Sequence, residues 1–566
     1  MMPEIYHVER NGKKYAYWST SRYEPGKKYP VTVNEYLGRV DEKTGHVIPK
    51  KSRATGASFI DEAALRSRRF GGSYALIGLA ESIGLRDDLY DAFGADGDRL
   101  LAVAVAQILA GGPLSSVEDA ADGCLVREIL GIGGRFGSPR MTELTQSLGE
   151  AFDSMETLFE RRLARAGDVL SYDITSVSTY GRMHGWAEWG HNRDEEAMRQ
   201  ANIGLITDRD GVPTMFEMYP GSVPDLATLQ RTVERVLALG AGTCTLVMDR
   251  GFGSAANLRF MIEAGMPFVI PGRHGTRCVK GLMSSLIRVR DEQERVRIHD
   301  GVVYAVIEAD AAIVARLRKG EEGEDSNDTA ELELVLEDDP RFASVPEEQR
   351  LKAFACYDAS KAAEDRRRLQ LALADIEERL RTMGPWAAVR EQRKVAGPYA
   401  KYLECRVEGD ALVIERKRNA LSFAVNREGM FVMLSQGVND WEAMMSCYDC
   451  RTYVEQAFDA LKNELDGNRW RTGDPTAARG RLFVKFVSLI LWCEASRRLR
   501  SERDRTPVSA ALQSLDNIMA VGVGDSWRVT EVTKANRGRL KAFGLPEPVK
   551  RYVLKDRDFI PQRYLH

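Results

Sequence analysis

The sequence predicts an α/β protein built around a mixed sheet, and three observations lead to this fold class. From Asp168 onward, the patterns follow the order strand, hairpin, helix, strand, helix, strand, which is typical of a sheet covered by helices. Short segments with alternating polarity near the N-terminus predict a separate β module. Between these two regions, apolar residues at three- and four-residue spacing predict a helical domain.

Length and composition limit the class of protein. With 566 residues the chain is too long for one hydrophobic core, and its 44% hydrophobic and 29% charged content is that of an ordinary globular protein. The net charge of −3 argues against a uniformly basic nucleic-acid binder. No signal-peptide pattern follows Met1, and the apolar runs are too short to cross a bilayer. We therefore expect a cytoplasmic protein with no membrane partner.

The two N-terminal domains are expected at residues 1–56 and 57–165. The first contains the alternating segments Lys14–Trp18 and Val31–Leu37, and it is basic, with eleven Lys and Arg against six Asp and Glu over residues 1–53. The second carries amphipathic helix patterns throughout. A basic β-rich module beside a helical domain makes DNA binding by the helical domain one possibility, and a supporting fold without a ligand is the other.

The rest of the chain is expected to form a split α/β domain. Its first part covers residues 166–273, and its second part covers residues 429–500. Residues 274–428 between them alternate like strands and include a long charged helix, so we expect an insertion that is mostly β. This insertion could be a shield over a site, a DNA clamp or a spacer. Residues 501–566 form a C-terminal region.

Two acidic residues mark the ends of predicted strands. Asp173 lies within SYDITSVS, where a charged side chain must be paired, coordinated or at an edge. Asp249 follows the buried strand TCTLVM and precedes a loop that opens before a helix. Ligand sites in open α/β sheets gather at such strand ends. Taken singly, an aspartate at such a position is more often a helix cap or a turn residue than part of a site.

A third carboxylate lies in the stretch YDCRTYVEQAFDALKNEL, which is predicted to be helical. On a continuous α-helix, Tyr448, Arg451, Glu455 and Lys462 would share a stripe about 60° wide. Three converging carboxylates would repel one another without a cation, and hard oxygen ligands suit Mg²⁺. Two such ions can support phosphodiester chemistry, and the arginine and lysine would then meet phosphates.

Other motifs support no competing chemistry. The sequence has no phosphate loop, no HExxH and no G-x-S-x-G, and its seven histidines show no ligand spacing. Cys447-x-x-Cys450 is the closest pair among eight cysteines and has no second pair nearby. We therefore interpret the cysteines as structural thiols.

The residues resemble a known family at this point. Tyr448, Arg451, Glu455 and Lys462 fit the pattern Y-x2-R-x3-E-x6-K, which surrounds the last acid of bacterial insertion-sequence DDE transposases of family four. YDITS around Asp173, the segment GSVPDLATL and LVMDRGF around Asp249 agree with this resemblance. It implies an RNase H-like catalytic domain, interrupted by an insertion before the glutamate.

The resemblance also implies an activity. Asp173, Asp249 and Glu455 would hold two Mg²⁺ ions, for which Mn²⁺ may substitute, and the enzyme would cut double-stranded DNA at the terminal inverted repeats of its element. The released 3′-hydroxyl would attack the opposite strand as a hairpin or attack target DNA. Tyr448, Arg451, Lys462 and Arg250 would hold the DNA end. A homodimer acting on paired ends in the bacterial nucleoid is expected.

Two alternatives stay open. An RNase H-like metal-dependent nuclease would keep the same carboxylates but would need neither end recognition nor strand transfer. An inactive transposase-derived DNA-binding protein would need only the DNA contacts, although this chain keeps all three acids.

Overall fold

The computed structural model describes residues 4–10, 12–22, 29–40, 47–49, 66–179, 187–189, 198–223, 225–316, 331–470, 472–523 and 526–553. The chain divides into two compact units, Met1–Arg66 and Ser67–His566.

The first unit contains a four-stranded antiparallel sheet in the order β1-β2-β3-β4. Its strands are β1 (Glu4–Arg10), β2 (Lys13–Arg22), β3 (Val31–Val40) and β4 (Val47–Pro49). Tyr6, Tyr17 and Tyr36 face one another across three strands, with ring centroids 5.7 and 5.2 Å apart. Cross-strand aromatic pairs of this kind stabilise a small sheet. The two strands predicted from alternation are confirmed.

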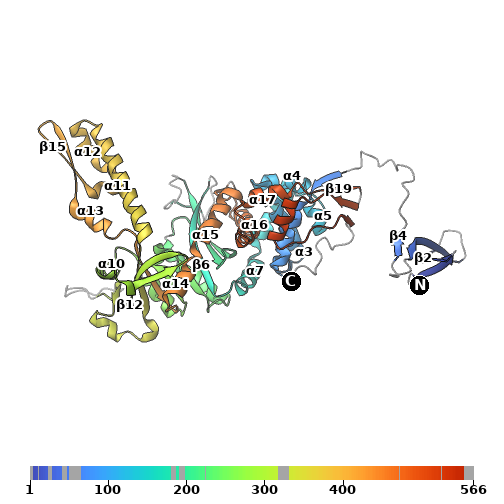
Figure 1. The fold of residues 1–566 in the computed structure, drawn as a ribbon, viewed down its shortest axis with the longest axis horizontal. Helices are drawn as coiled ribbons and strands as arrows, with labels where there is room; N and C mark the ends of the chain where they lie inside the picture. The colour runs from blue at the N-terminus through green and yellow to red at the C-terminus, as the bar shows by residue number, and fades with distance from the viewer. Residues whose placement is uncertain are drawn as a thin grey trace. The chain divides into compact units, whose positions relative to one another are not determined.

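The second unit is built on a sheet that has 11 strands among the described residues (Figure 1). Along the main path the order is β11 (Val296–His299), β12 (Val302–Ala315), β14 (Leu351–Asp358), β17 (Met430–Gln436), β10 (Phe268–Pro271), β9 (Thr245–Met248), β6 (Val169–Thr179), β7 (Gln200–Asp208) and β8 (Pro213–Pro220). Two strands branch off this path: β13 (Leu332–Leu336) pairs with β12, and β18 (Arg469–Trp470) pairs with β6. The strands β6, β9 and β10 are parallel to one another. β7 is antiparallel to both of its neighbours, β6 and β8, and β17 is antiparallel to β10. The predicted mixed sheet is confirmed.

The predicted hairpin forms for reasons that the sequence makes plain. At its turn, the Asp208 carboxylate accepts hydrogen bonds from the backbone N–H groups of Asp210 and Val212, at 3.0 and 2.8 Å. Gly211 has φ +85°, a left-handed conformation that glycine adopts without strain. Side chains on both strands are buried almost throughout, so this hairpin is part of the core of the unit.

Helices connect the parallel strands. α8 (Asp225–Ala238) leads from the hairpin to β9, and α9 (Ala255–Glu263) leads from β9 to β10. The Ser254 hydroxyl caps α9 by accepting the Asn257 N–H at 3.1 Å, as expected at a helix start. α10 (Arg277–Val289) follows β10 and packs against β14 and β17.

A helical region lies beside the sheet and encloses one long helix. Its members are α1 (Gly71–Ser82), α2 (Leu85–Phe93), α3 (Ala95–Ala110), α4 (Val117–Asp122), α5 (Val126–Leu130), α6 (Ser138–Glu150) and α7 (Phe152–Ala164). α16 (Pro475–Ser501) runs among them and is buried along most of its length. A Cβ atom on Gly480 would lie 1.8 Å from the Thr145 carbonyl oxygen, so only glycine lets α6 and α16 approach this closely.

The C-terminal region returns to this helical region. After α17 (Val508–Leu515), the strands β19 (Met519–Val523), β20 (Ser526–Val529) and β21 (Arg551–Val553) form a sheet with β5 (Arg66–Arg69). α18 (Lys534–Ala542) lies between the last two strands in the chain. No single helix in the described ranges has the length and apolar character to cross a membrane; α3 and the segment Leu114–Asp122 meet that test only as a pair bent by 102°.

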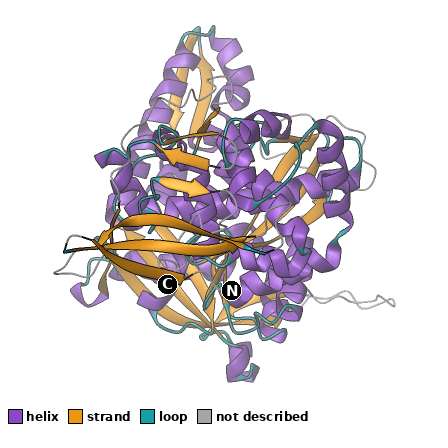
Figure 2. Cartoon of the chain, turned by 90° about the vertical axis from the view of Figure 1, so that its right-hand side faces the viewer, coloured by secondary structure: helices purple, strands orange, loops and turns teal. Residues whose placement is uncertain are grey.

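Residues 359–428 form a projection that we call the arm. It consists of α11 (Ala359–Arg381), α12 (Pro385–Ala396), β15 (Leu403–Glu408), β16 (Ala411–Arg416) and α13 (Arg418–Val425). Helices and the two-stranded hairpin of the arm appear together at the top of Figure 2. The strands β11 to β14 extend the large sheet, and the arm that follows is mainly helical. Residues 274–428 are therefore not mostly β, as the sequence predicted, because α10, α11, α12 and α13 contain more of the described residues than the strands do.

Candidate active site

Strand register brings two of the predicted acids to adjacent positions. In the parallel pair β6 and β9, Tyr172 lies opposite Met248. Asp173 is the next residue of β6, and Asp249 directly follows the last residue of β9, so the two aspartates lie at adjacent positions. Neighbouring strands are about 4.8 Å apart, and residues in register point to the same side of a sheet. Sequence-distant acids thus meet at one place on the sheet.

The surroundings of the two aspartates explain their positions. Asp173 is half-buried between the fully buried Tyr172 and Ile174, and its Oδ1 accepts the Ile174 N–H at 2.8 Å. Asp249 caps the short helical turn Arg250–Phe252, and its Oδ1 accepts the Arg250 N–H at 2.7 Å. The second carboxylate is therefore oriented by the turn that ends its strand.

The stretch from Tyr448 to Leu465 is not one continuous α-helix, contrary to the sequence prediction. α14 (Trp441–Tyr448) ends at the tyrosine, α15 (Arg451–Asp459) follows a tight turn, and Ala460–Glu464 form a π-helical turn. In the tight turn the Tyr453 N–H donates to the Cys450 carbonyl at 3.0 Å, three residues back. The angles of an ideal α-helix therefore do not extend to Lys462, which lies half-buried in the π turn.

Glu455 nevertheless reaches the sheet edge, because α15 packs on β6. Val454, Ala457 and Phe458 are buried beneath the helix, which leaves Glu455 on its more exposed side. Figure 1 shows α15 lying beside β6. The buried face of α15 therefore fixes the direction of the glutamate.

Arg451 links the glutamate to the second aspartate. Its Nη2 lies 2.6 Å from Glu455 Oε1 and 3.5 Å from Asp249 Oδ1. Because both contacts end on the same nitrogen, the two carboxylate oxygens are at most about 6 Å apart, close enough for a strong electrostatic interaction. One guanidinium therefore offsets the repulsion that two converging carboxylates would otherwise feel.

Tyr448 completes this group. The Arg451 guanidinium carbon lies 6.0 Å from the centre of the Tyr448 ring. Burial opposes the charge on Arg451, but Tyr448, Asp249 and Glu455 outweigh burial and raise the pKa of the guanidinium. Burial also raises the pKa of the Tyr448 hydroxyl, and Asp249 adds to that rise. Tyr448, Arg451, Glu455 and Asp249 are thus brought together.

Two cations outside the signature lie at the same edge. Arg250 begins the turn after Asp249 and is exposed. Arg273, which follows the neighbouring strand β10, donates from Nη2 to the Gly251 carbonyl at 2.5 Å and so fastens this turn. Sequence reasoning missed Arg273, although its place directly after the strand FVIP was a signal of the same kind as that of Asp249.

A histidine also ties the tight turn to the extended sheet. His299, at the end of β11, lies 2.7 Å from the Asp449 carboxylate through its Nε2. Its ring also meets Trp441 edge-on, with centroids 6.1 Å apart. These contacts of His299 help to orient α15.

Cys447 and Cys450 in this segment are buried, and burial raises the pKa of the Cys450 thiol to about 12.

The donor set suits a hard divalent cation in chemical type. Asp173, Asp249 and Glu455 offer only carboxylate oxygens, the ligands that Mg²⁺ and Mn²⁺ prefer. In the part of the chain that the structure describes, no group of three or more His, Cys, Asp or Glu side chains is already drawn together as a metal site. Arg451 lies between two of the acids instead, so a metal would have to share or replace its contacts with them.

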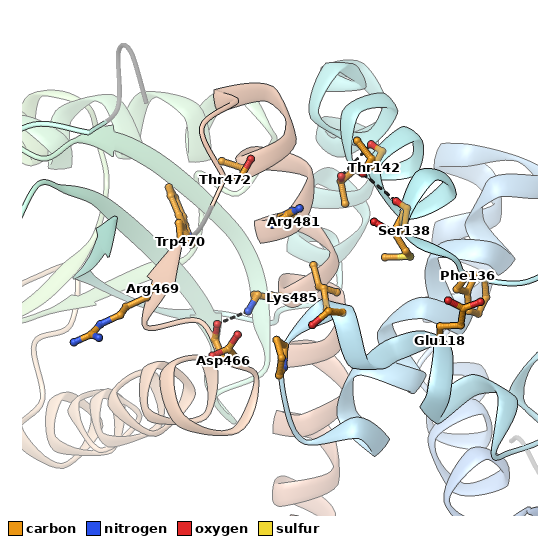
Figure 3. A pocket seen from close by; sticks show the side chains of 16 residues that line it. Glu118, Phe136, Ser138, Thr142, Asp466, Arg469, Trp470, Thr472, Arg481 and Lys485 are labelled. Carbon is orange, nitrogen blue, oxygen red and sulfur yellow. Dashed lines mark hydrogen bonds between the residues drawn. The ribbon is translucent and has the colours of Figure 1, made fainter. Parts of the chain in front are cut away.

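A separate cavity lies at the far end of β6. It has a volume of about 280 Å³ and lies between the helical region and the start of α16 (Figure 3). Trp470, Arg481 and Lys485 are among its lining residues, and the lining, as far as the chain is described, includes none of the predicted site residues. Lys485 is buried and donates to the carbonyls of Leu465 and Asp466 at 2.6 and 2.5 Å.

Comparison with known proteins identifies the family. In this site Asp173 within β6 lies next to Asp249 at the end of β9, and Arg451 links Asp249 to Glu455 on the packed helix α15. The family described as "Transposase DDE domain" matches residues 165–491, which is more than half of the chain. The chain therefore belongs to this transposase family.

Other comparisons add little. No curated protein matches this sequence. Among solved structures, a piggyBac transposase synaptic complex with hairpin DNA is similar at 9% identity, over 87% of this chain and 74% of that chain, with a TM-score of 0.31. A likeness at this score supports no argument about fold or mechanism.

Proposed function

We propose that this protein is a DDE transposase of the family-four insertion-sequence type, which cuts DNA at the ends of its element and joins them to target DNA. The main observation behind the proposal is that Asp249 and Glu455 both contact the guanidinium of Arg451. Asp249 follows β9, which pairs with β6, the strand that contains Asp173. These are the acids that the resemblance implies for catalysis. The strand order β8-β7-β6-β9-β10, with β9 and β10 parallel to β6, supports an RNase H-like core.

In this proposal the three carboxylates hold two Mg²⁺ ions, or Mn²⁺ in their place. When bound, such ions lower the pKa of a water or a 3′-hydroxyl and stabilise the leaving oxygen of a phosphodiester. Asp173 and Asp249 supply oxygen ligands from the sheet, and Glu455 supplies them from α15. The packing of α15 on β6 holds these donors at a fixed separation, which positions the scissile phosphate.

The cations around the acids would hold the DNA end. Arg451 can form a forked pair of hydrogen bonds with a phosphate once its carboxylate contacts are shared with a metal. Lys462 would act as a point charge, Arg250 would meet the backbone beside Asp249, and Tyr448 would pack against the terminal nucleotide. A homodimer on paired ends, with either a hairpin or a direct attack on target DNA, belongs to the same proposal.

The direct test is Mg²⁺-dependent cleavage of a plasmid that carries the inverted repeats flanking the gene. We expect Asp173→Asn, Asp249→Asn and Glu455→Gln each to reduce cleavage by about 10³-fold or more while DNA binding is kept, because each removes a charged ligand. Glu442→Gln, which neutralises an exposed acid on neighbouring α14, is the matched control and should cut normally.

Product mapping separates the alternatives. Strand-specific mapping should show a free 3′-hydroxyl at the element end and joined products with target DNA. Cleavage without joining, at sites unrelated to the repeats, would favour the metal-dependent nuclease. Binding without any cleavage would favour the inactive DNA-binding protein. Retained cleavage in any one of the three acid variants would remove that residue from the site.

A further inference from the structure

We propose that one face of the arm is a second DNA-binding surface, which holds the duplex outside the site. This inference rests on the proposed function and names a contact that the site residues do not provide. The surface is the α12 face, which we define as Trp386, Arg390, Arg393 and Lys394. The three cations follow Trp386 by four, seven and eight residues, so all four side chains lie on one side of the helix.

The arm's own core determines which side of α12 faces solvent. Ala388 and Ala396 are buried against Leu373, Ile376 and Leu403 in a cluster made only of arm residues. Gln392 also faces inward, donating to the Leu403 carbonyl at 2.9 Å. The opposite side of the helix therefore projects away from the arm.

That outward side is unusual in its exposure and charge. Trp386 is 73% exposed, although large aromatic side chains are normally covered. Arg390, Arg393 and Lys394 are exposed as well. The acid Glu391 pairs with Arg390 at 3.2 Å, and among the described residues no carboxylate is within ion-pair distance of Arg393 or Lys394. The α12 face thus presents an aromatic ring among cations with little neutralising charge.

Strand directions put the arm at the edge of the sheet that carries the acids. β14 pairs with β17, which pairs with β10, and both pairings are antiparallel, so β14 runs in the same direction as β10, β9 and β6. The arm follows the end of β14 as Asp249 follows the end of β9. Three strand spacings, about 14 Å, separate these two strands within the sheet.

The arm is long enough to follow DNA away from the site. α11 has 23 residues, which span about 34 Å. That is close to one turn of B-form DNA, about 34 to 36 Å. α12 runs back along α11, because Ala396 and Tyr399 lie beside Ala372 and Ile376 around a shared hollow. Trp386 is therefore near the outer end of the arm, with Arg393 and Lys394 closer to the sheet.

DNA fits this surface better than a protein partner does. Cations with few acidic neighbours attract a polyanion, and an exposed aromatic ring can pack on the sugars along one strand of a duplex. A second copy of this chain would need a larger apolar area than one tryptophan provides. The α12 face therefore completes a path for the duplex that begins at Asp249 and continues along the arm.

The test measures how DNA binding by the full-length protein depends on salt, and it compares the unaltered protein with two variants. The DNA is a duplex of about 40 base pairs and arbitrary sequence. The variant Arg390→Gln/Arg393→Gln/Lys394→Gln should lower the slope of log Kd against log salt by about 2 to 3, since each phosphate contact contributes about 0.9. The control variant Arg528→Gln/Lys534→Gln/Lys541→Gln removes three exposed cations elsewhere and should leave the slope unchanged.

Further readouts make the outcome decisive. Trp386→Ala should weaken binding about five- to tenfold, because it removes the apolar area that packs on the sugars, and Trp386→Phe should restore most of it. The control variant should cleave as the unaltered protein does at every protein concentration, whereas the triple variant should need more protein to reach the same cleavage. Thermal unfolding of each variant should match that of the unaltered protein.

Contrary results fall into distinct classes. If the unaltered protein cuts DNA and the triple variant keeps the full salt slope, the α12 face is not a DNA contact and the proposed function stands. If the unaltered protein binds no duplex, both proposals fail. The triple variant could instead keep the full salt slope but change the molecular mass that light scattering measures for the DNA-free protein. The α12 face would then contact a second copy of the chain, which also overturns the inference.

Discussion

Arg451 at the sheet edge and Arg393 on the arm are the same residue type in opposite settings. The Arg451 side chain is only 27% exposed and contacts two carboxylates, whereas Arg393 is exposed and has no carboxylate nearby among the described residues. A partly buried charge interacts strongly with its neighbours because little water screens it. An exposed charge acts mainly at longer range, on a polyanion that approaches it.

The large sheet and the arm also differ in their hydrophobic cores. The large sheet and the helical region share one continuous apolar cluster, while the arm has a small cluster of its own. The sheet edge depends on packing from distant parts of the chain, whereas the arm depends mainly on residues near it in sequence. We therefore expect the site to be precise and easily disrupted, and the arm to be a semi-independent extension.

The largest expected effect comes from two matched substitutions, each of which replaces a buried leucine by alanine, one in the large sheet and one in the arm. Leu246 in β9 and Leu373 in α11 are both fully buried. Leu246→Ala should destabilise the whole unit by about 2 to 5 kcal/mol, because the cavity lies in the shared core. Leu373→Ala should loosen only the arm, with faster hydrogen exchange there and an unchanged main transition in calorimetry. An equal drop of the main transition in both variants would show that the arm is not a separate cooperative unit.

An intermediate effect is expected from the buried lysine. Burial lowers the pKa of Lys485 to about 8, whereas an unfolded lysine titrates near 10.4. Between these values the unfolded chain holds a proton that the folded chain has released, so the stability contributed by this group rises as pH rises. Relative to Lys485→Met, the unaltered protein should gain about 2 to 3 kcal/mol of unfolding free energy from pH 8 to pH 10.5.

Chemical denaturation at several pH values measures this difference. Lys394→Met on the arm is the control, because an exposed ammonium changes its surroundings little on unfolding. A difference between the unaltered protein and Lys485→Met that stays constant across this pH range would show that the lysine is not held in a desolvated position.

The smallest expected effect concerns competition at the acids. Arg451→Gln removes the guanidinium that contacts Asp249 and Glu455, so Mg²⁺ should bind the DNA-free protein about three- to tenfold more tightly. Titration calorimetry measures this change, and Arg393→Gln on the arm should leave it unaltered. Weaker or unchanged Mg²⁺ binding in Arg451→Gln would mean that the arginine does not compete with a metal.

Local sequence patterns were sufficient for the strands and acids of the central sheet. The run around Asp173, the hairpin and the strand before Asp249 each carry their own signal, in β-branched residues, turn residues and apolar continuity. The pattern Y-x2-R-x3-E likewise predicted a shared face, which the contacts of Arg451 with Tyr448 and Glu455 bear out in geometry. Whether these residues form a catalytic site stays a prediction.

Other features could not be predicted because they depend on residues far apart in sequence. The register of β6 and β9, which aligns Asp173 with Asp249, is set by backbone pairing between strands about 75 residues apart in the chain. The extension of the sheet through β17, β14 and β12 had no local signal that distinguished it from a separate domain. The tight turn and π turn around α15 depend on how this helix meets β6 and α16.

Helix and strand periodicity and turn preferences are local properties, so the residue pattern was enough to predict most strands of the central sheet and the residue types that could carry chemistry. The contacts of Arg451 with both Asp249 and Glu455, and the position of the arm at the edge of the sheet where Asp249 lies, arise from contacts between segments far apart in the chain. Both outcomes follow from packing and strand pairing, which bring distant segments together and whose energies no single segment contains.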